Sequence, residues 1–447
     1  MGCPVFLLGF GTSPAREEYF GGGANICRER LFLCHGIVRG IRTGPDNINA
    51  DNTNDVMGKK AVGYLLYNFL ILATIGIFLL AVGGWRAPQV DPARSGFYVF
   101  LGLALPVVLF ANLSLLVYWC VRRKVWLLFP LAALLLNTGY FTAMYQWPGG
   151  GDESRPADLK VASYNVHAFR EQGADIRQTV RQMAYLFREE GADVVCLEEF
   201  VPAPRFGLDS IISRFHDWPH VAAGVAITIF SKYPILDAEV IPFPDTDNSA
   251  LWVDLLISGQ KVRVLAVHLQ TTGVDRAQRN LSYQSRNLSV EGSSEAMEQM
   301  QASYRANAVV RAQQVARLRQ MVDTLRMPLI VCGDFNDMPS SYTYRAMKGD
   351  LHDGFKDCGS GYGGTFRHFK GLLRIDYMFY NDAFSGERYY TLDVPYSDHK
   401  PVLMDFSFRS GETDHGSGKT GSERRAACNA RNKPVTSRQA NPPPTGR

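Results

Sequence analysis

Hydrophobic positions are distributed unevenly, and they divide the chain into an apolar N-terminal part and a longer mixed part. Three uninterrupted apolar runs occupy residues 62–83, 97–120 and 125–145. None has a charged residue at its centre. Each is close to the roughly 20 residues that a helix needs to cross about 30 Å of hydrocarbon. We therefore expect three transmembrane helices within 57–147, with a buried helical bundle in a soluble domain as the alternative.

Basic residues in the short connections predict how these helices would be oriented. The cytoplasmic side is expected to carry the excess of lysine and arginine. Lys59 and Lys60 precede the first run, and the basic triplet 122–124 separates the second run from the third. We therefore expect a multi-pass protein of the plasma (inner) membrane, whose chain beyond the third run faces the outside or periplasm.

The two ends of the chain have a different composition. Residues 1–56 are rich in Gly, Arg and Asn without a sustained period, and Met57 followed by two lysines resembles a natural start of translation. We expect 1–56 to be a disordered leader or a mis-assigned upstream extension. Residues 409–447 are polar and rich in Gly, Ser and Pro, which predicts a disordered tail.

Between the linker 148–157 and this tail, residues 158–408 alternate short β-branched runs with helical periodicity. Residues 175–191 have apolar positions at helical spacing and predict an amphipathic helix, and 271–325 predict a long polar, then helical, excursion. The predicted strands are 160–166, 193–200, 224–235, 251–257, 261–270, 327–337, 374–380 and 401–408. This alternation indicates an α/β domain.

Composition and charge exclude several classes of protein. The chain is 46% hydrophobic and 20% charged, which is typical of a folded protein. Its 47 basic and 43 acidic residues give a net charge of +4, which argues against a polybasic nucleic-acid binder. The eight cysteines form no CxxC pair, which argues against a structural zinc site or a disulfide scaffold.

Polar side chains recur where the predicted strands end. Taken alone, each has an ordinary explanation, such as a turn former or a satisfied core histidine. Taken together, they predict a site, because strand ends meet at one rim of a sheet and ligands usually bind there in α/β proteins. The residues are Asn165, Glu199, His268, Asp334, Asn336, Asp376, Asp398 and His399.

The chemistry of this set favours hydrolysis at phosphorus. Carboxylate and amide oxygens without thiolates suit a hard cation such as Mg²⁺, Mn²⁺ or Ca²⁺, and we expect Mg²⁺, with Mn²⁺ as a substitute. Such a cation polarises a phosphoryl oxygen, a carboxylate with an amide orients water, and an imidazole binds phosphate or protonates the leaving oxygen. Neither a GxSxG nucleophile elbow nor a P-loop occurs in the sequence.

Seven sequence blocks, in this order, resemble the endonuclease/exonuclease/phosphatase superfamily, in a membrane-anchored bacterial form close to deoxyribonucleases and sphingomyelinases. They are SYNV (163–166), CLEEF (196–200), FSKYPI (230–235), HLQ (268–270), GDFND (333–337), RIDYMF (374–379) and SDHKPV (397–402). The resemblance covers nearly all of 158–408. It implies a four-layer α/β/β/α sandwich, that is, two packed mixed sheets flanked by helices.

The resemblance also implies a ligand set for the metal. Glu199 would be the main Mg²⁺ ligand, with Asn165 beside the metal and the substrate phosphate. Asp398 would complete the acidic rim and contact the metal. Two departures from the family pattern occur: Glu198 precedes Glu199, so either glutamate is open as the ligand, and His167 stands where the abasic-site branch has an acid.

The catalytic roles follow by the same resemblance. Asp334 would position or deprotonate the attacking water, and Asn336 would help to orient it and bind substrate. His268 would bind the phosphate or protonate the leaving group. Asp376 would orient His399 as an Asp–His dyad.

We therefore expect a membrane-anchored, Mg²⁺-dependent phosphoesterase that uses in-line attack of water. The expected partners are the bilayer and a substrate that is nucleic acid, a phospholipid head group or a small phosphate ester, and no obligate protein partner is evident. Arginines of the 271–325 excursion would line a groove for nucleic acid, or else lie on solvated helix faces: Arg276, Arg279, Arg286, Arg305 and Arg311. The alternative is a non-catalytic receptor or scaffold with the same fold, in which site residues would be lost.

Overall fold

The computed structural model describes residues 50–147, 157–170, 175–202, 206–244, 246–273 and 290–409. The predicted leader and tail lie outside these residues, except for 50–56 and Arg409, and so does the linker except for Ala157. Helix α1 (Ala50–Arg86) already includes 50–56. The predictions of disorder at the two ends stay predictions.

The three apolar runs form helices. Helices α1 and α2 (Gly96–Val121) are joined by the short η1 (Ala87–Gln89), and both are long and apolar enough to cross a membrane. The third run is bent by 53° between 125–136 and helix α4 (Thr138–Met144), so it counts as a span only if the bent pair is taken together. The bend occurs at Asn137, whose amide donates to the carbonyl of Ala81 in α1 as well as to its own turn.

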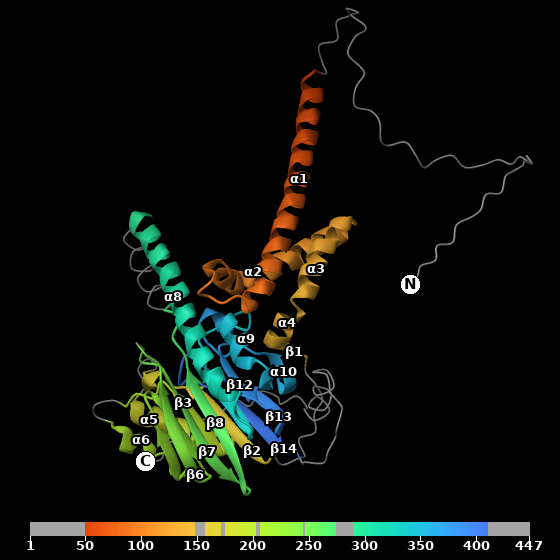
Figure 1. The fold of residues 1–447 in the computed structure, drawn as a ribbon. Helices are drawn as coiled ribbons and strands as arrows, with labels where there is room; N and C mark the ends of the chain where they lie inside the picture. The colour runs from red at the N-terminus through yellow and green to blue at the C-terminus, as the bar shows by residue number, and fades with distance from the viewer. Residues whose placement is uncertain are drawn as a thin grey trace, which may run out of the picture. The chain divides into compact units, whose positions relative to one another are not determined.

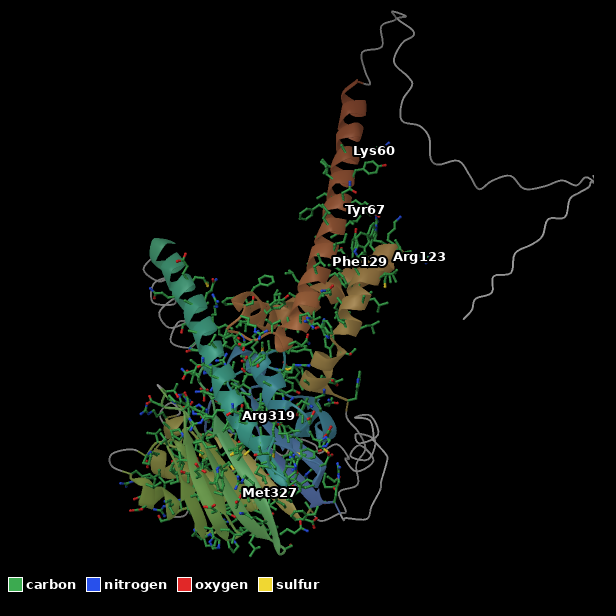
Figure 2. All side chains as sticks on the ribbon, viewed as in Figure 1. Lys60, Tyr67, Arg123, Phe129, Arg319 and Met327 are labelled. Atoms are coloured by element: carbon green, nitrogen blue, oxygen red, sulfur yellow. The ribbon has the colours of Figure 1, made fainter. Side chains whose placement is uncertain are left out.

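Polar side chains inside these helices contact the neighbouring helix. The indole nitrogen of Trp119 donates to the hydroxyl of Thr74 (3.0 Å), and the amide of Asn112 donates to the carbonyl of Ile77 (3.4 Å). Such bonds hold apolar helices together where the hydrophobic effect between them is weak. Much of the outer surface consists of exposed large apolar side chains (Figure 2), including Leu65, Phe69, Leu72, Val107 and Phe110.

Within the described residues, twelve strands form two six-stranded mixed sheets. The first has the order β13-β14-β2-β3-β5-β4, with bounds Phe384–Thr391, Val402–Phe408, Leu159–Asn165, Val194–Glu198, Ile227–Ser231 and His220–Ala223. The second has the order β10-β12-β9-β8-β7-β6, with bounds His352–Asp353, Asp376–Tyr380, Leu329–Asp334, Gln260–His268, Ser249–Ile257 and Ile235–Pro242. Strands β2 and β3 are parallel, as are β8 and β9.

The sheets pack face to face, and helices cover their outer faces (Figure 1). Residues of both sheets form the inner core, for example Cys196 of β3 with Cys332 of β9. Helices α5 (Ile176–Glu189) and α6 (Leu208–Ile212) pack on the first sheet. Helices α8 (Val290–Val322) and α9 (Tyr342–Lys348) pack on the second. This confirms the predicted four-layer sandwich.

Two features of the sheets differ from the prediction. The single strand predicted over 224–235 is two strands, because β5 ends at Ser231 and β6 begins in the other sheet at Ile235. The hydroxyl of Ser231 bonds both the backbone nitrogen and the carbonyl of Tyr233, and Pro234 has no N–H for a ladder, so the chain turns here. Strands β4, β10 and β13 were not predicted: β4 and β10 are very short, and the β13 sequence FSGERYYT lacks an apolar run.

A buried ion pair joins the apolar helices to the sandwich. The guanidinium of Arg374 contacts the carboxylate of Asp353, and both side chains are fully buried. Arg374 also donates to the carbonyl of Ala143 in α4 (2.9 Å), and the hydroxyl of Tyr344 donates to Asp353 (2.7 Å). Burial would raise the pKa of Asp353, but the charge and hydrogen bonds of Arg374 outweigh it and lower the pKa, so the pair is ionised.

We expect Arg374→Met to lower the free energy of unfolding by about 3–5 kcal/mol, because it leaves Asp353 as an uncompensated buried charge. The control is Arg188→Met, whose ion pair with Glu189 is exposed and contributes at most about 1 kcal/mol. The measurement is urea denaturation of the full chain in detergent, followed by tryptophan fluorescence. Equal midpoints for the two variants would contradict a stabilising role of the buried pair.

Candidate active site

The strand register brings most of the predicted residues to one end of the sandwich. Asp334, the last residue of β9, is paired with His268 at the end of β8 and with Asp376 at the start of β12. In the other sheet, Asn165 at the end of β2 is paired with Glu198 at the end of β3. The site is therefore built from the same end of both sheets.

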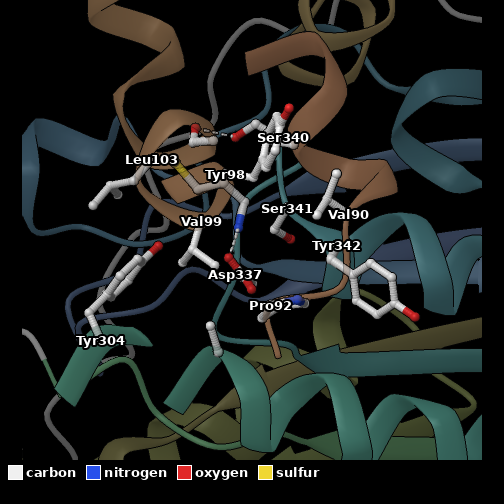
Figure 3. A pocket seen from close by; sticks show the side chains of 14 residues that line it. Val90, Pro92, Tyr98, Val99, Leu103, Tyr304, Asp337, Ser340, Ser341 and Tyr342 are labelled. Atoms are coloured by element: carbon white, nitrogen blue, oxygen red, sulfur yellow. Dashed lines mark hydrogen bonds between the residues drawn. The ribbon is translucent and has the colours of Figure 1, made fainter. Parts of the chain in front are cut away.

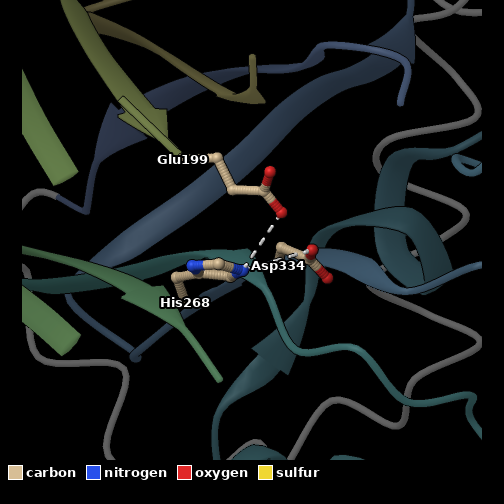
Figure 4. Close-up of side chains that lie close together, drawn as sticks. All are labelled: Glu199, His268 and Asp334. Atoms are coloured by element: carbon tan, nitrogen blue, oxygen red, sulfur yellow. Dashed lines mark ion pairs between the residues drawn. The ribbon is translucent and has the colours of Figure 1, made fainter. Parts of the chain in front are cut away.

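The first group of side chains contains Glu199, His268 and Asp334 (Figure 4). Nε2 of His268 lies 3.6 Å from Oε1 of Glu199 and 3.9 Å from Oδ2 of Asp334. The amide of Asn165 donates to both carboxylates, at 3.1 Å to Glu199 and 3.0 Å to Asp334. Asn165 belongs to the first sheet and Asp334 to the second, so this amide connects the sheets across the site.

The second group contains Asp334, Asp376 and His399. Nδ1 of His399 lies 3.0 Å from Oδ2 of Asp376 and 3.1 Å from Oδ1. Nε2 on the other side of the ring lies 3.8 Å from Oδ2 of Asp334. The expected Asp–His pair is thus in contact, and the carboxylate of Asp334 takes part in both groups.

The backbone around these residues is in uncommon conformations. Glu199 and Asn336 have φ of 50° and 51°, a region that costs free energy for residues other than glycine and clusters at functional sites. Asn336 is held by its contacts, since its backbone nitrogen donates to Oδ1 of Asp334 (2.8 Å) and its amide donates to Oδ2 (3.1 Å). At Gly333, a Cβ would lie 1.9 Å from the carbonyl oxygen of Val267, so only glycine fits between β8 and β9.

The two adjacent glutamates lie in different environments. Glu198 is fully buried and accepts a hydrogen bond from Ser163 (2.9 Å), and burial raises its pKa well above the usual value. Glu199 is partly exposed at the site. Burial would raise its pKa too, but His268 and the bond from Asn165 outweigh this and lower it. Glu199 is therefore the ionised carboxylate of the pair at neutral pH.

Burial and neighbouring charges also shift the pKa of the central groups. Burial raises the pKa of Asp334 to about 7, although His399 opposes the shift. Burial would lower the pKa of His399, but the carboxylates of Asp376 and Asp334 outweigh it and raise the pKa to about 10. Burial lowers the pKa of His268, against the attraction of Glu199. At neutral pH, His399 is a cation and His268 is a neutral imidazole.

Asp398 lies beside these groups and belongs to neither of them. Its carboxylate is 3.3 Å from Nδ1 of His167 and 3.9 Å from Nε2 of His368. The expected metal contact of Asp398 stays a prediction.

Of the arginines proposed for a groove, three lie outside the described residues. Arg311 is fully buried against Asp337 (3.1 Å), so it lines no groove, and Arg305 lies against Gly96 of α2.

Three further residues at the site were not predicted. The amide nitrogen of Asn248 lies 3.2 Å from Nδ1 of His268 and orients that ring. The hydroxyl of Thr365 accepts from the backbone nitrogen of Asp376 (3.1 Å), and the ring of Phe366 lies 4.9 Å from that of His399. All three come from loops whose position depends on tertiary packing, and no local sequence pattern indicates them.

A family model described as the Endonuclease/Exonuclease/phosphatase family matches residues 162–399, which include strands of both sheets and every residue of the two groups. The chain belongs to this family. Members of the endonuclease/exonuclease/phosphatase family hydrolyse phosphoester bonds. A second model, described as a domain of unknown function (DUF8431), matches residues 67–144, that is, the apolar helices.

Several solved structures are similar to this family member. An endonuclease/exonuclease/phosphatase from Beutenbergia cavernae is 22% identical, with 57% of this chain and 72% of that chain covered and a TM-score of 0.41. The Bacteroides thetaiotaomicron mannosyl-6-phosphatase Bt3783 is 17% identical (56% and 100% covered, TM-score 0.39). The human Nocturnin catalytic domain is 18% identical (59% and 100% covered, TM-score 0.41). A comparison with curated proteins found no significant match.

The donor atoms fit the divalent cation on which the family generally depends. In each of the two groups, one donor atom per residue lies within 4.8 Å of the others. The donors are carboxylates and imidazoles, with no thiolate among them, which suits a hard cation. Two carboxylates close together at a buried site also repel each other unless a cation or a proton compensates them.

The same substitution at Glu198 and at Glu199 tests which of the two glutamates is needed for hydrolysis. We expect Glu199→Gln to lower kcat/KM for bis(4-nitrophenyl) phosphate by about a hundredfold or more, because it removes an ionised donor from the site. Glu198→Gln should stay within about threefold of wild type, since Glu198 is neutral and the new amide oxygen still accepts from Ser163. The reverse order of effects would show that Glu198 is the functional glutamate.

Proposed function

We propose that this protein is a membrane-anchored, Mg²⁺-dependent phosphoesterase that hydrolyses phosphodiester or phosphomonoester bonds by in-line attack of water. The observation that carries the proposal is the convergence of two groups of ionisable side chains, from both sheets, on the carboxylate of Asp334. In a member of a phosphoester-hydrolysing family, such a grouping is the arrangement expected of a working site.

Glu199, with Asn165 beside it, would hold the cation, and Asp398 is a further candidate ligand. The oxygen donors favour Mg²⁺, with Mn²⁺ as a substitute. When bound, a divalent cation polarises a phosphoryl oxygen and neutralises the negative charge that develops in the transition state.

Asp334 is the proposed acceptor of the proton from the attacking water. Amide groups of Asn165 and Asn336 contact its carboxylate and hold it in one orientation. A pKa of about 7 suits a group that must accept and release a proton near neutral pH. Asn165 and Asn336 also present polar atoms with which substrate oxygens would bond.

The two histidines have different proposed roles because their charges differ. His399 is protonated and held by Asp376, so it would supply a fixed positive charge to the phosphate. His268 is neutral and is held by Asn248 with Nε2 near Glu199. His268 would bind the phosphate or donate a proton to the leaving oxygen.

The anchoring part of the proposal rests on the apolar helices. Helices α1 and α2, and the bent third run if taken together, have the length and composition to cross a membrane, and they expose large apolar side chains. Lys59 and Lys60, in α1 just ahead of its apolar run, and the basic residues after α2 support a cytoplasmic N-terminus. The catalytic domain would then lie outside the plasma (inner) membrane.

Metal removal tests the proposal. Treatment of the purified full chain with EDTA should abolish hydrolysis of bis(4-nitrophenyl) phosphate, and Mg²⁺ or Mn²⁺ should restore it, because the carboxylate groups need a cation to bind phosphate oxygens. Calorimetric titration with Mg²⁺ should show weaker binding by Glu199→Gln. Hydrolysis that persists in EDTA would contradict the mechanism.

The pH dependence of Asp376→Asn tests the dyad. In wild type, His399 stays charged until the pH approaches about 10, so it does not limit activity near neutrality. Without the carboxylate of Asp376, burial is opposed only by the weaker attraction of Asp334 and Asp398, so the pKa of His399 falls and its charge is lost at a lower pH. The kcat/KM of the variant should therefore fall between about pH 6 and 8, where wild type does not. The exposed Asp237→Asn is the control, and parallel profiles for Asp376→Asn and wild type would refute the dyad.

A further inference from the structure

The end of the sandwich that carries the site is the end against which the apolar helices pack. From Asp334 the chain continues through Asn336 and Asp337 to Ser340, whose hydroxyl donates to the carbonyl of Gly102 in α2 (2.8 Å; Figure 3). A Cβ on Gly102 would lie 2.8 Å from the carbonyl oxygen of Ser340, so helix and loop touch backbone to backbone. Ser340, only six positions after Asp334, thus contacts a helix that is apolar enough to span a membrane.

A loop on the other side of the site, residues 366–373, is attached to the catalytic groups. The ring of Phe366 packs on His399, and the backbone nitrogen of Arg367 donates to the carbonyl of Asp398 (2.7 Å). The loop closes tightly, since a Cβ on Gly364 would lie 1.9 Å from the carbonyl oxygen of Gly371. Its position is therefore fixed relative to the site.

The 366–373 loop presents apolar side chains to the outside. Phe369 is 47% exposed and Leu372 is 56% exposed, with the exposed Lys370 between them. Phe369 and Lys370 have φ of 52° and 59°, which is costly for such residues and persists where the surroundings impose it. Large apolar side chains that point outward beside a lysine are typical of segments that enter a membrane interface.

The same loop is connected to the end of the third apolar run. The hydroxyl of Tyr362 donates to the carbonyl of Leu372. Tyr362 lies in β11 (Gly361–Tyr362), which pairs with β1 (Tyr145–Gln146) directly after α4. Tyr145, Trp147 and Tyr362 are 42%, 74% and 48% exposed. Exposed Tyr and Trp at the end of an apolar helix mark the level of the membrane–water interface.

Apolar side chains also flank the site near Glu199. The backbone nitrogen of Phe200 donates to the carbonyl of Ala226 (2.9 Å), which places the turn 224–226 beside Glu199. Val201 and Val225, on these two segments, are 42% and 54% exposed. Exposed apolar residues thus lie on the segments next to His399 and on those next to Glu199.

We propose that the 366–373 loop, with Tyr145, Trp147 and Tyr362, lies in the head-group layer of the bilayer, and that the site takes the phosphate ester of a membrane lipid as its substrate. This inference rests on the proposed phosphoesterase function. Lys370 supplies a positive charge to the lipid phosphates. A nucleic acid is disfavoured, because it needs many phosphate contacts, whereas the chain is nearly neutral and Arg311 is buried.

The reaction adds one water across a P–O ester bond. The phosphorus takes the hydroxyl group, the bond to the departing oxygen breaks, and that oxygen takes a proton. One product stays in the bilayer and the other leaves into water, so turnover is measured as phosphorus or alcohol released from vesicles.

The test uses the full chain reconstituted with Mg²⁺ into phosphatidylethanolamine–phosphatidylglycerol vesicles that contain phosphatidylcholine, phosphatidylinositol or sphingomyelin in turn. Two further substrates are dihexanoyl lipids of the same head groups, as dissolved monomers, and single-stranded DNA. We expect hydrolysis of a bilayer lipid, and we expect Phe369→Ser with Leu372→Ser to lower it by about tenfold or more, because two interfacial side chains are lost. Hydrolysis of the monomeric analogue should change less than about twofold, since the catalytic groups are intact.

The matched control is Leu236→Ser in β6, which removes an exposed leucine (53%) at the end of the strand remote from the site and should change neither rate. Hydrolysis of bis(4-nitrophenyl) phosphate distinguishes a failure of the lipid inference from a failure of the phosphoesterase proposal. If that diester is cleaved but no bilayer lipid is, or if DNA is cleaved faster, the lipid inference is wrong and the phosphoesterase proposal stands. If neither this diester, nor the monoester 4-nitrophenyl phosphate, nor any of the lipids is cleaved, the phosphoesterase proposal itself fails. An equal loss on bilayer and monomeric lipid would refute the interfacial role of the loop.

Discussion

The site depends on one buried carboxylate. Asp334 is almost fully buried, where an unpaired charge costs several kcal/mol, so it persists only with partners on every side. Those partners come from both sheets: the amide of Asn165 and the ring of His399, just before β14, from the first, and Asn336 and His268 from the second. Groups from both sheets contact one oxygen of Asp334. The contacts that fix the position of one sheet relative to the other therefore also fix the geometry of the site.

Much of this arrangement follows from local sequence. Polar residues at the ends of short apolar strands must meet when the strands align, which is why Asn165, His268, Asp334 and Asp376 were predicted together. The local sequence pattern could not show which of Glu198 and Glu199 lies at the site. That depends on which of the two side chains points into the core at the end of β3. It missed Asn248, since that residue acts only through its contact with His268.

The apolar helices and the sandwich are connected at several independent points. Arg374 connects the core of the sandwich to the carbonyl of Ala143, β1 pairs with β11, and Ser340 bonds Gly102. The sequence pattern predicted helices and a separate domain, joined only by the linker 148–157. The contacts come from residues in the middle of the domain, far along the chain from the helices, so no local pattern indicated them.

The contact at Gly102 has a consequence for how the protein would respond to its bilayer. The first turns of α2 are used against Ser340, so only residues 103–121 remain for hydrocarbon, about 28 Å at 1.5 Å per residue. This length nearly equals the thickness of an ordinary bilayer core and leaves little room for tilt. In a chain anchored as proposed, the length of α2 would fix the distance between the catalytic end of the sandwich and the membrane surface. A change in the acyl-chain length of the lipids would then change the distance from the site to the lipid phosphates.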